Sequence, residues 1–200
     1  KGLVEACKDA GIELLFENGE AYSDDTIEST YKIDGDVITV NLLKGEGLGA
    51  VLKDADLSGI NTIRIVSENN KILRDYDYKY LSEIKVSNID LSLSNAGEVW
   101  NDEAIRGILE EGNEWLKFIK LPEGIKTIAD SAFKNCRGLE RIYLPSTLIT
   151  IKSAVFEGDI SLKDLVIPDS VDCIWSEAFY KATIENLKLT KPSSNISSRA

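Results

Sequence analysis

The sequence predicts a right-handed solenoid of the α/β class, made of stacked coils of about 23 residues. Pro122, Pro145 and Pro168 stand 23 residues apart, and three phenylalanines keep the same interval. An apolar-x-x-apolar-x-apolar segment lies before each of these prolines, with the spacing of a half-buried strand. One such unit cannot bury its apolar face alone, whereas stacked units can. We therefore expect a parallel sheet on one face of the solenoid and short strands or helical turns on the other.

Each of the first three strands is expected to end at its proline, because proline has no amide hydrogen to donate to the ladder. The fourth segment begins one residue earlier than the repeat interval requires, as expected of a terminal coil. The phenylalanine column is predicted to be buried between the coils. The strand segments are Leu116/Ile119/Leu121, Leu139/Ile142/Leu144, Leu162/Leu165/Ile167 and Ile184/Leu187/Leu189, and the column is Phe133, Phe156 and Phe179.

Residues 116–190 resemble the BspA-like type of leucine-rich repeat. The resemblance is carried by "LPEGIKTIADSAFKNCRGLERIYLP" and by "STLITIKSAVFEGDISLKDLVIPDSVDCIWSEAFYKATIENLKL". The family pattern runs roughly I-P-x-x-V-x-x-I-G-x-x-A-F-x-x-C-x-x-L-x-x-I. The family's cysteine is kept at Cys136 but is replaced by Asp159 and Ala182 in the next two repeats. The family's glycine position is occupied by Ala129, Lys152 and Trp175.

Residues 46–94 are predicted to form irregular coils that precede the regular repeats. The strand spacing recurs at Ile60/Ile63/Ile65 and at Leu81/Ile84/Val86. This region also resembles the N-terminal cap of Bacteroides-type members of the family. The resemblance implies a helix at Leu48–Lys53, a first solenoid strand at Ile60–Val66 and a second helix at about Asp75–Leu81.

Residues 95–115 are predicted to be an insertion between the irregular and the regular coils. Asn101 or Asp102 can cap a short helix there, because Glu103 follows in the first turn and three apolar residues share one face. Residues 193–200 are expected to form a tail that is either a linker-like terminus or a frayed end.

Residues 1–45 form either an N-terminal cap or the end of a preceding domain. The segment "YKIDGDVITVNL" predicts a β-hairpin whose turn is Asp34-Gly35. Residues 17–29 are polar and acidic and are expected to form a mobile loop. The segment "GLVEACKDAGIELLF" combines helix-like and strand-like spacings, so both states stay open there.

Composition argues against several classes of function. The chain has 23 basic and 34 acidic residues and a net charge of −11, which disfavours nucleic acid as a partner. It contains no histidine, so the commonest general base and metal ligand are missing. We therefore predict no enzyme activity, no metal and no cofactor. No apolar run reaches the roughly 18 to 20 residues of a membrane span, and no signal peptide is present in the sequence.

The three cysteines are too few for a disulfide framework. Cys136 and Cys173 are predicted to be small buried apolar residues. Cys7 follows "LVEA", a loose match to a lipidation motif, but the apolar run that such a motif needs ahead of it is missing.

The candidate ligand-binding residues are the strand positions that point outward. If residues 119 and 121 point inward, residues 118 and 120 point outward, because successive side chains alternate along a strand. Phe118, Tyr143 and Val166 would then form an apolar streak flanked by charges, or else a scattered surface covered by loops or by a partner domain. Trp175 is expected to project outward near a coil corner. The candidate residues are Phe118, Lys120, Arg141, Tyr143, Asp164, Val166, Asn186 and Lys188.

The family resemblance implies a bacterial cell-surface or extracellular binding module. Its partners would be host or bacterial surface proteins or glycans, because BspA-like proteins include adhesins. The alternative is a rigid spacer or scaffold in a surface assembly, and the ligand and oligomeric state stay open.

Overall fold

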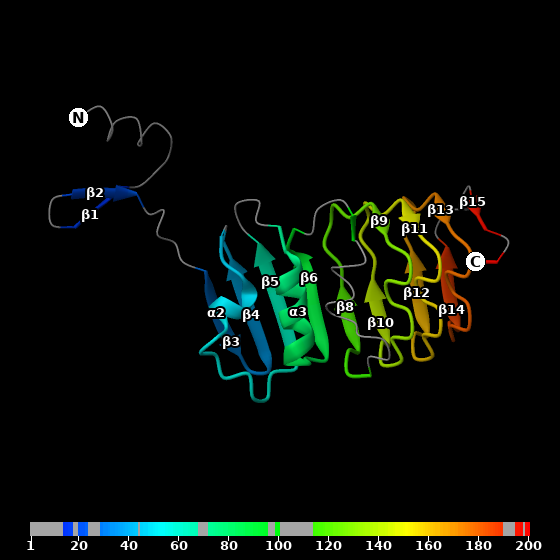
Figure 1. The fold of residues 1–200 in the computed structure, drawn as a ribbon, viewed down its shortest axis with the longest axis horizontal. Helices are drawn as coiled ribbons and strands as arrows, with labels where there is room; N and C mark the ends of the chain where they lie inside the picture. The colour runs from blue at the N-terminus through cyan, green and yellow to red at the C-terminus, as the bar shows by residue number, and fades with distance from the viewer. Residues whose placement is uncertain are drawn as a thin grey trace, which may run out of the picture.

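The computed structural model describes residues 14–17, 20–23, 29–43, 45–67, 72–95, 99–100, 114–189, 195–197 and 199–200. Most of these residues belong to a stack of coils that runs along the long axis of the molecule (Figure 1). An eight-stranded sheet, in the order β14-β12-β10-β8-β6-β5-β4-β3, forms one side of the stack. A five-stranded sheet, β15-β13-β11-β9-β7, forms another. The predicted repeat solenoid is therefore confirmed.

The regular coils each contribute one short strand to the larger sheet. These strands are β8 (Phe118–Lys120), β10 (Arg141–Tyr143), β12 (Asp164–Ile167) and β14 (Asn186–Leu189), and all pair in parallel. The register pairs Phe118 with Arg141 and Arg141 with Asp164, which is the same interval as that between the prolines. Asp164 pairs with Asn186, an offset shorter by one, so the shortened last coil is confirmed.

Each regular coil crosses to the second sheet through a two-residue strand. Its strands are β7 (Val99–Trp100), β9 (Thr127–Ile128), β11 (Thr150–Ile151), β13 (Cys173–Ile174) and β15 (Asn195–Ile196), all parallel. Turns, not helices, follow β9, β11 and β13. The described residues form two helices, α2 (Leu48–Val51) and α3 (Asp75–Ile84), both in the irregular coils. Neither has the length and hydrophobicity to cross a bilayer.

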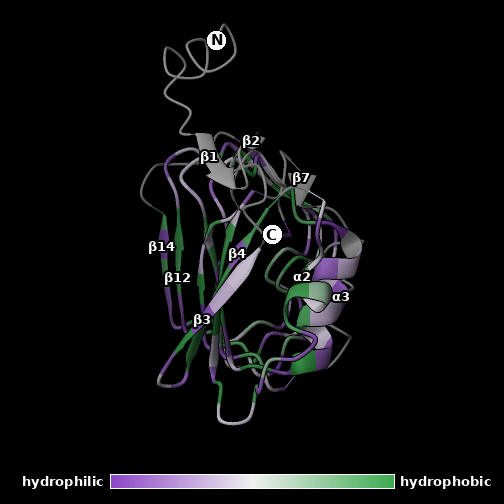
Figure 2. Cartoon of the chain, turned by 90° about the vertical axis from the view of Figure 1, so that its left-hand side faces the viewer, coloured by the Kyte–Doolittle hydropathy of each residue, from purple (hydrophilic) through white to green (hydrophobic). Residues whose placement is uncertain are grey.

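The irregular coils extend the same sheet with longer repeats. Strands β4 (Val37–Leu42), β5 (Thr62–Ser67) and β6 (Asn88–Leu93) pair in parallel, and β6 pairs in parallel with β8. Each of these pairings joins residues that are further apart in the sequence than in the regular coils. Helices α2 and α3 cover the inner side of this part of the sheet (Figure 2). Both helices were predicted, although α2 ends two residues earlier than expected and α3 runs three residues further.

Two predictions for the irregular coils were wrong. The strand expected at Ile60–Val66 is β5, but it is not the first of the sheet, because β4 pairs with it in parallel. The Leu81/Ile84/Val86 segment is not a strand, because Leu81 and Ile84 lie in α3. The strand is β6, and Val86 just before it and Ile89 and Leu91 within it repeat the same spacing and are all buried. A three-residue apolar interval also fits one face of a helix, so the spacing alone does not separate the two structures.

The predicted N-terminal hairpin is present and caps the sheet. Strand β3 (Thr30–Asp34) pairs antiparallel with β4, and Asp34 faces Val37 in the last pair. The turn residues are therefore Gly35 and Asp36, one residue later than predicted. Gly35 has a φ of 61° at the first turn position, where a type II′ hairpin turn requires glycine.

Residues 17–29 are not a continuous loop. Strand β1 (Leu14–Glu17) pairs antiparallel with β2 (Glu20–Ser23), which lies inside the expected loop. The acidic composition that indicated a loop does not prevent backbone pairing between these two strands. The helix predicted to start at Asn101 or Asp102, and Cys7, lie outside the described residues.

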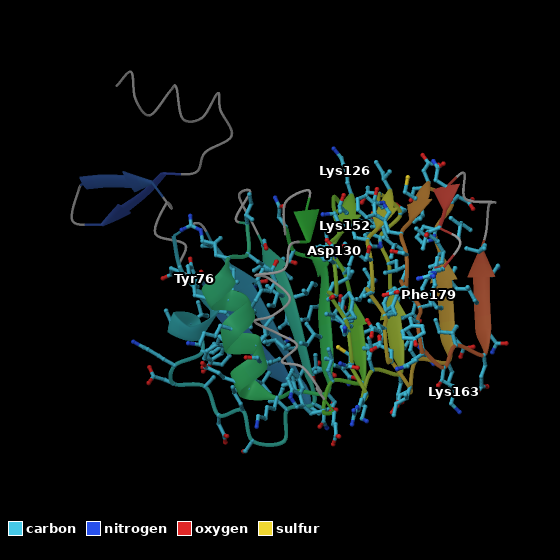
Figure 3. All side chains as sticks on the ribbon, turned by 45° about the vertical axis from the view of Figure 1, so that its right-hand side comes forward. Tyr76, Lys126, Asp130, Lys152, Lys163 and Phe179 are labelled. Atoms are coloured by element: carbon cyan, nitrogen blue, oxygen red, sulfur yellow. The ribbon has the colours of Figure 1, made fainter. Side chains whose placement is uncertain are left out.

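The phenylalanine column forms the centre of the regular coils. Phe133 and Phe156 are fully buried, and their ring centroids lie 5.6 Å apart with planes 10° from parallel. Phe156 stacks on Phe179 at 5.7 Å and 2°. Phe179, on the last coil, is partly buried and is labelled in Figure 3. The predicted column is confirmed, and its burial depends on having a coil on each side.

Polar contacts between neighbouring coils follow the same repeat. The Lys152 ammonium lies 3.8 Å from Asp130 Oδ2 on the preceding coil (Figure 3). Lys163 Nζ lies 3.5 Å from Glu185 Oε1 at the edge of the larger sheet. These pairs are solvent-exposed and each contributes little, so the apolar columns carry most of the stability.

Each regular coil contains two positions with left-handed backbone. Ser131, Ala154 and Glu177 have φ between 56° and 61° and occupy equivalent places in successive coils. Asn135, Gly158 and Lys181 form a second column with φ between 57° and 77°. These turns reverse the chain behind β9, β11 and β13, and they explain Gly158, which stands outside the family's usual glycine position.

Replacing Phe156 by alanine is expected to lower the free energy of unfolding by about 3 to 5 kcal/mol, because the change leaves a cavity between two packed coils. Phe179→Ala is the matched control at the end of the column and should cost less, since that ring is already partly exposed. Chemical denaturation of both variants measures the difference. Equal losses, or a loss below about 1 kcal/mol for Phe156→Ala, would contradict the stacked column.

Replacing Glu177 by glycine is expected to raise the free energy of unfolding by about 1 kcal/mol, because a non-glycine residue is strained at a φ of 60°. The control is Ser176→Gly, where the backbone is not left-handed and glycine only adds entropy to the unfolded chain. Denaturant titration compares the two. The strain argument fails if both variants lose stability equally.

Candidate functional site

The outer face of the larger sheet carries all eight predicted residues. Burial alternates along the strands: Arg141 and Tyr143 of β10 are exposed and Ile142 between them is buried. The same alternation holds in β12, where Asp164 and Val166 are exposed. This face lies on the side of the sheet away from α2 and α3 (Figure 2). The strand register therefore points the predicted residues outward, as expected.

The parallel register sorts these residues into two rows that run across the strands. Both rows follow from the pairing of each strand with its neighbour. The first row is Phe118, Arg141, Asp164 and Asn186, and the second row is Lys120, Tyr143, Val166 and Lys188. Neighbouring members of a row are about 4.8 Å apart, the spacing between strands. We call the surface made by these eight residues the outer patch.

A surface aromatic pair lies at one side of the outer patch. Phe118 and Tyr143 occupy diagonal positions on β8 and β10, and their ring centroids are 5.5 Å apart with planes at 63°. This edge-to-face geometry is favourable for two aromatic rings. Tyr143 is 48% exposed and Val166, on the next strand, is 52% exposed. The predicted apolar streak is therefore present on the surface.

A pocket of about 580 Å³ opens beside this streak. Arg141, Tyr143, Asp164 and Val166 line it, so half of the predicted residues meet in one cavity. Its volume lies in the range of small-ligand pockets. The remaining lining residues are Glu123, Ile142, Leu144, Ser146 and Pro168.

The rim of this pocket was not predicted. Glu123 lies in the turn after β8 and accepts hydrogen bonds from the backbone N–H of Ser146 at 3.1 Å and from its hydroxyl at 3.0 Å. Leu144 and Pro168 stand where β10 and β12 end. One full repeat separates Glu123 from Ser146, and this was the signal available in the sequence, because it places both at the same corner of adjacent coils.

Charges are distributed unevenly over the sheet face. Lys120, Arg141 and Lys188 make no ion pair within the described part of the chain. Asp164, the only acid of the outer patch, accepts a hydrogen bond from Asn186 Nδ2 at 2.6 Å. The outer patch is therefore locally cationic on a protein whose net charge is −11.

The neighbouring part of the sheet has a neutralised pair instead. On β5 and β6, Arg64 Nε donates to Asp90 Oδ2 at 3.1 Å. Burial raises the pKa of Asp90, but hydrogen bonds from Ser92 and Arg64 outweigh it and hold this pKa below its ordinary value. Asp90 therefore stays ionised and compensates Arg64, and it is also the register partner of Lys120 in the outer patch.

Trp175 projects outward, as predicted. Its side chain is 49% exposed, and the Lys152 ammonium lies 5.9 Å from its ring centroid. Trp175 also lines an open groove of about 400 Å³ with Ile196 at the second sheet. None of the residues that line this groove is a Lys or an Arg, in contrast to the outer patch.

The two described cysteines differ in environment. Cys136 is buried, as predicted, whereas Cys173 is only partly buried, so that prediction was wrong. The position beside β13 accounts for this, because inward-facing Ile174 is buried and its neighbour Cys173 points to the surface. The described residues contain no group of three or more His, Cys, Asp or Glu side chains that could hold a metal.

Asp159 is a fully buried acid inside the stack. Its Oδ1 accepts a hydrogen bond from the backbone N–H of Cys136 at 2.8 Å, and its Oδ2 has no hydrogen-bond partner among the described residues. Burial raises the pKa of Asp159 to about 8, although the hydrogen bond from Cys136 opposes this rise. Burial and the neighbouring Asp159 also raise the pKa of the Cys136 thiol. Neither group is exposed enough to contact a ligand.

One family model and several solved structures are similar to this chain. The model of the BspA type leucine rich repeat region matches residues 111–200 in six copies. No curated protein matches.

Three solved structures are similar to the chain. The T. pallidum leucine rich repeat protein is 20% identical over 80% of this chain and 67% of its own, with a TM-score of 0.44. The pneumococcal vaccine antigen PcpA is 19% identical over 69% of this chain and 40% of its own, with a TM-score of 0.41. A leucine rich cell surface protein from Faecalibacterium prausnitzii is 14% identical over 87% of this chain and 55% of its own, with a TM-score of 0.31.

The buried Asp159 predicts that stability falls as pH rises. Its folded pKa of about 8 lies above the ordinary value of 3.8, so the stabilisation is complete below about 3.8 and is lost as the pH rises to about 8. Denaturation between pH 5 and pH 8 should show this decline, and Asp159→Asn should reduce its slope. Asp90 does not interfere, because its pKa lies below this window. A slope that is unchanged in Asp159→Asn would contradict the assignment.

Proposed function

Since the repeats at residues 111–200 belong to the BspA-type leucine-rich repeat family, we propose that this chain is a non-enzymatic binding module. It presents the outer patch of its larger sheet to a protein or glycan ligand. The family resemblance supports a position at the cell surface or outside the cell, with adhesion as the role.

The observation that carries this proposal is the pocket beside the surface aromatic pair. Soluble proteins cover an open sheet face mainly with polar side chains, and a contiguous apolar area next to a cavity is typical of a binding site. Tyr143 and Val166 are each about half exposed and both line the cavity. Tyrosine and arginine are also the residues that anchor many protein interfaces, and Arg141 lies beside them.

The chemistry of the pocket supports binding and not catalysis. Its wall is largely apolar, through Tyr143, Val166, Leu144 and Pro168. Its two carboxylates already accept hydrogen bonds, Glu123 from Ser146 and Asp164 from Asn186. The absence of histidine from the sequence removes the most frequent general base.

A rigid spacer or scaffold is the second candidate function. The favouring observation is the continuity of the eight-stranded sheet, since contacts between all neighbouring coils make the solenoid stiff. A spacer would hold neighbouring domains at a fixed distance and would not bind a ligand through the outer patch. The binding function therefore predicts that ligand binding is lost when Tyr143 is replaced, whereas the spacer function predicts no effect of this replacement.

Tyr143→Ala is expected to abolish or strongly weaken ligand binding while the melting temperature falls only slightly, because the ring is about half exposed, lies outside the core and loses only its contact with Phe118. An array of purified extracellular-matrix proteins and glycans, probed with the full chain, identifies ligands for the measurement. Tyr76→Ala is the matched control, since Tyr76 of α3 is 47% exposed on the opposite side of the sheet. Ligands that bind wild type and Tyr143→Ala equally would favour the spacer function.

A further inference from the structure

We infer that the ligand of the outer patch is a protein segment in which an apolar side chain has acidic side chains on both sides. This inference rests on the proposed binding function and adds the chemical class of the partner. Three observations support it. The first is the order of charged and apolar side chains across four strands. The others are the hydrogen bonds that the pocket carboxylates already accept, and the positive charge of the outer patch on a chain whose net charge is negative.

The second row of the outer patch has a defined order across the strands. Lys120 on β8 and Lys188 on β14 are the outer members, with Tyr143 and Val166 between them. Three strand intervals of about 4.8 Å separate the two lysine positions by about 14 Å. A complementary segment therefore places its apolar side chain at the centre and its acids on either side.

Arg141 adds a third cation next to the apolar centre. Arg141 lines the pocket together with Tyr143. Asp164 is its register partner on β12, but no ion pair engages Arg141 within the described residues. A guanidinium can bind a carboxylate through two parallel hydrogen bonds, which makes it the stronger anchor for an acidic side chain. The only acid in the outer patch, Asp164, already accepts a hydrogen bond from Asn186.

The contrast with the whole chain limits the size of an anionic partner. A net charge of −11 repels a long polyanion. A short acidic segment needs only the local field of the outer patch, where Lys120, Arg141 and Lys188 outnumber the single carboxylate of Asp164, while Glu123 at the pocket rim accepts two hydrogen bonds from Ser146. The Debye length of about 8 Å at physiological salt screens the remote acidic groups from such a segment. A local acidic segment of a protein therefore fits better than a polymer such as nucleic acid.

The pocket favours an apolar side chain over a sugar. A sugar is bound mainly through several hydrogen bonds, and both carboxylates of the pocket already accept some, Glu123 from Ser146 and Asp164 from Asn186. Apart from Arg141, which is assigned to an acidic side chain, the wall consists mainly of Tyr143, Val166, Leu144 and Pro168. An aromatic or aliphatic side chain buries these surfaces without requiring new polar contacts.

Selection from a library of random 12-residue peptides on the immobilised full chain tests the inference, with Tyr143→Ala used for counter-selection. The enriched peptides should carry a central aromatic or aliphatic residue with Asp or Glu on both sides. Fluorescence anisotropy with the synthetic peptides should show at least tenfold weaker binding for Arg141→Glu. The binding should also weaken as sodium chloride is raised.

The matched control is Lys79→Glu, which makes the same change in charge on the exposed side of α3. It should leave the peptide affinity within about twofold, because the site lies beyond the screening distance on the other side of the sheet. Circular dichroism and melting temperature establish that each variant is folded. Equal weakening by Lys79→Glu and Arg141→Glu would mean a general charge effect and would overturn the inference.

Other outcomes separate this inference from the proposed function. If the enriched peptides are neutral or basic, or if a glycan binds in a Tyr143-dependent and Arg141-independent way, the binding function stands and the acidic partner is wrong. Self-association that is lost in Tyr143→Ala would identify a second copy as the occupant and would also overturn the inference. If no ligand or peptide depends on Tyr143, both the inference and the binding function fail.

Discussion

Stacking of each coil on the next is the interaction on which the rest of this structure depends. Successive regular coils keep one constant offset in both sheets, and the last coil is shorter by one in both. The phenylalanine rings and the buried aliphatic columns follow the same offset. Because inner side chains fix the register, they also fix the side chains that alternate with them. The rows of the outer patch are therefore a consequence of packing on the opposite face of the same strands.

The same constraint explains why equivalent residues differ in environment. Leu165 and Ile167 of β12 are 0% and 1% exposed, whereas Leu187 and Leu189 of β14 are 43% and 40% exposed. The residue types are alike, so the difference comes from the second neighbouring coil, which the last strand of the described sheet lacks. Asp159 shows the opposite case, because it stands in a column that holds Cys136 one coil earlier. Stacking of the coils buries the residue at this position whatever its type, and burial raises the pKa of the Asp159 carboxyl.

Sequence periodicity was sufficient to predict the regular coils and to predict which strand side chains point outward in the outer patch. Proline and phenylalanine markers define the repeat, and strand alternation then places Tyr143 and Val166 outside. It was insufficient where local patterns are ambiguous. The interval of Leu81 and Ile84 suits a helix as well as a strand, and only packing against the sheet decides between them. The pocket rim was missed because it depends on how Glu123 and Ser146 meet across coils, which a pattern within one coil does not contain.

The size of the recognition unit follows from the stack. One coil contributes only two outward residues to the outer patch, so no single repeat contains a cation, an apolar centre and a second cation. The row from Lys120 through Tyr143 and Val166 to Lys188 needs four consecutive coils in register. Substitution of an outer residue leaves the inner columns intact, since the two sets point to opposite faces. Binding specificity can therefore change from coil to coil while stability is maintained, provided that the interval between the coils is kept.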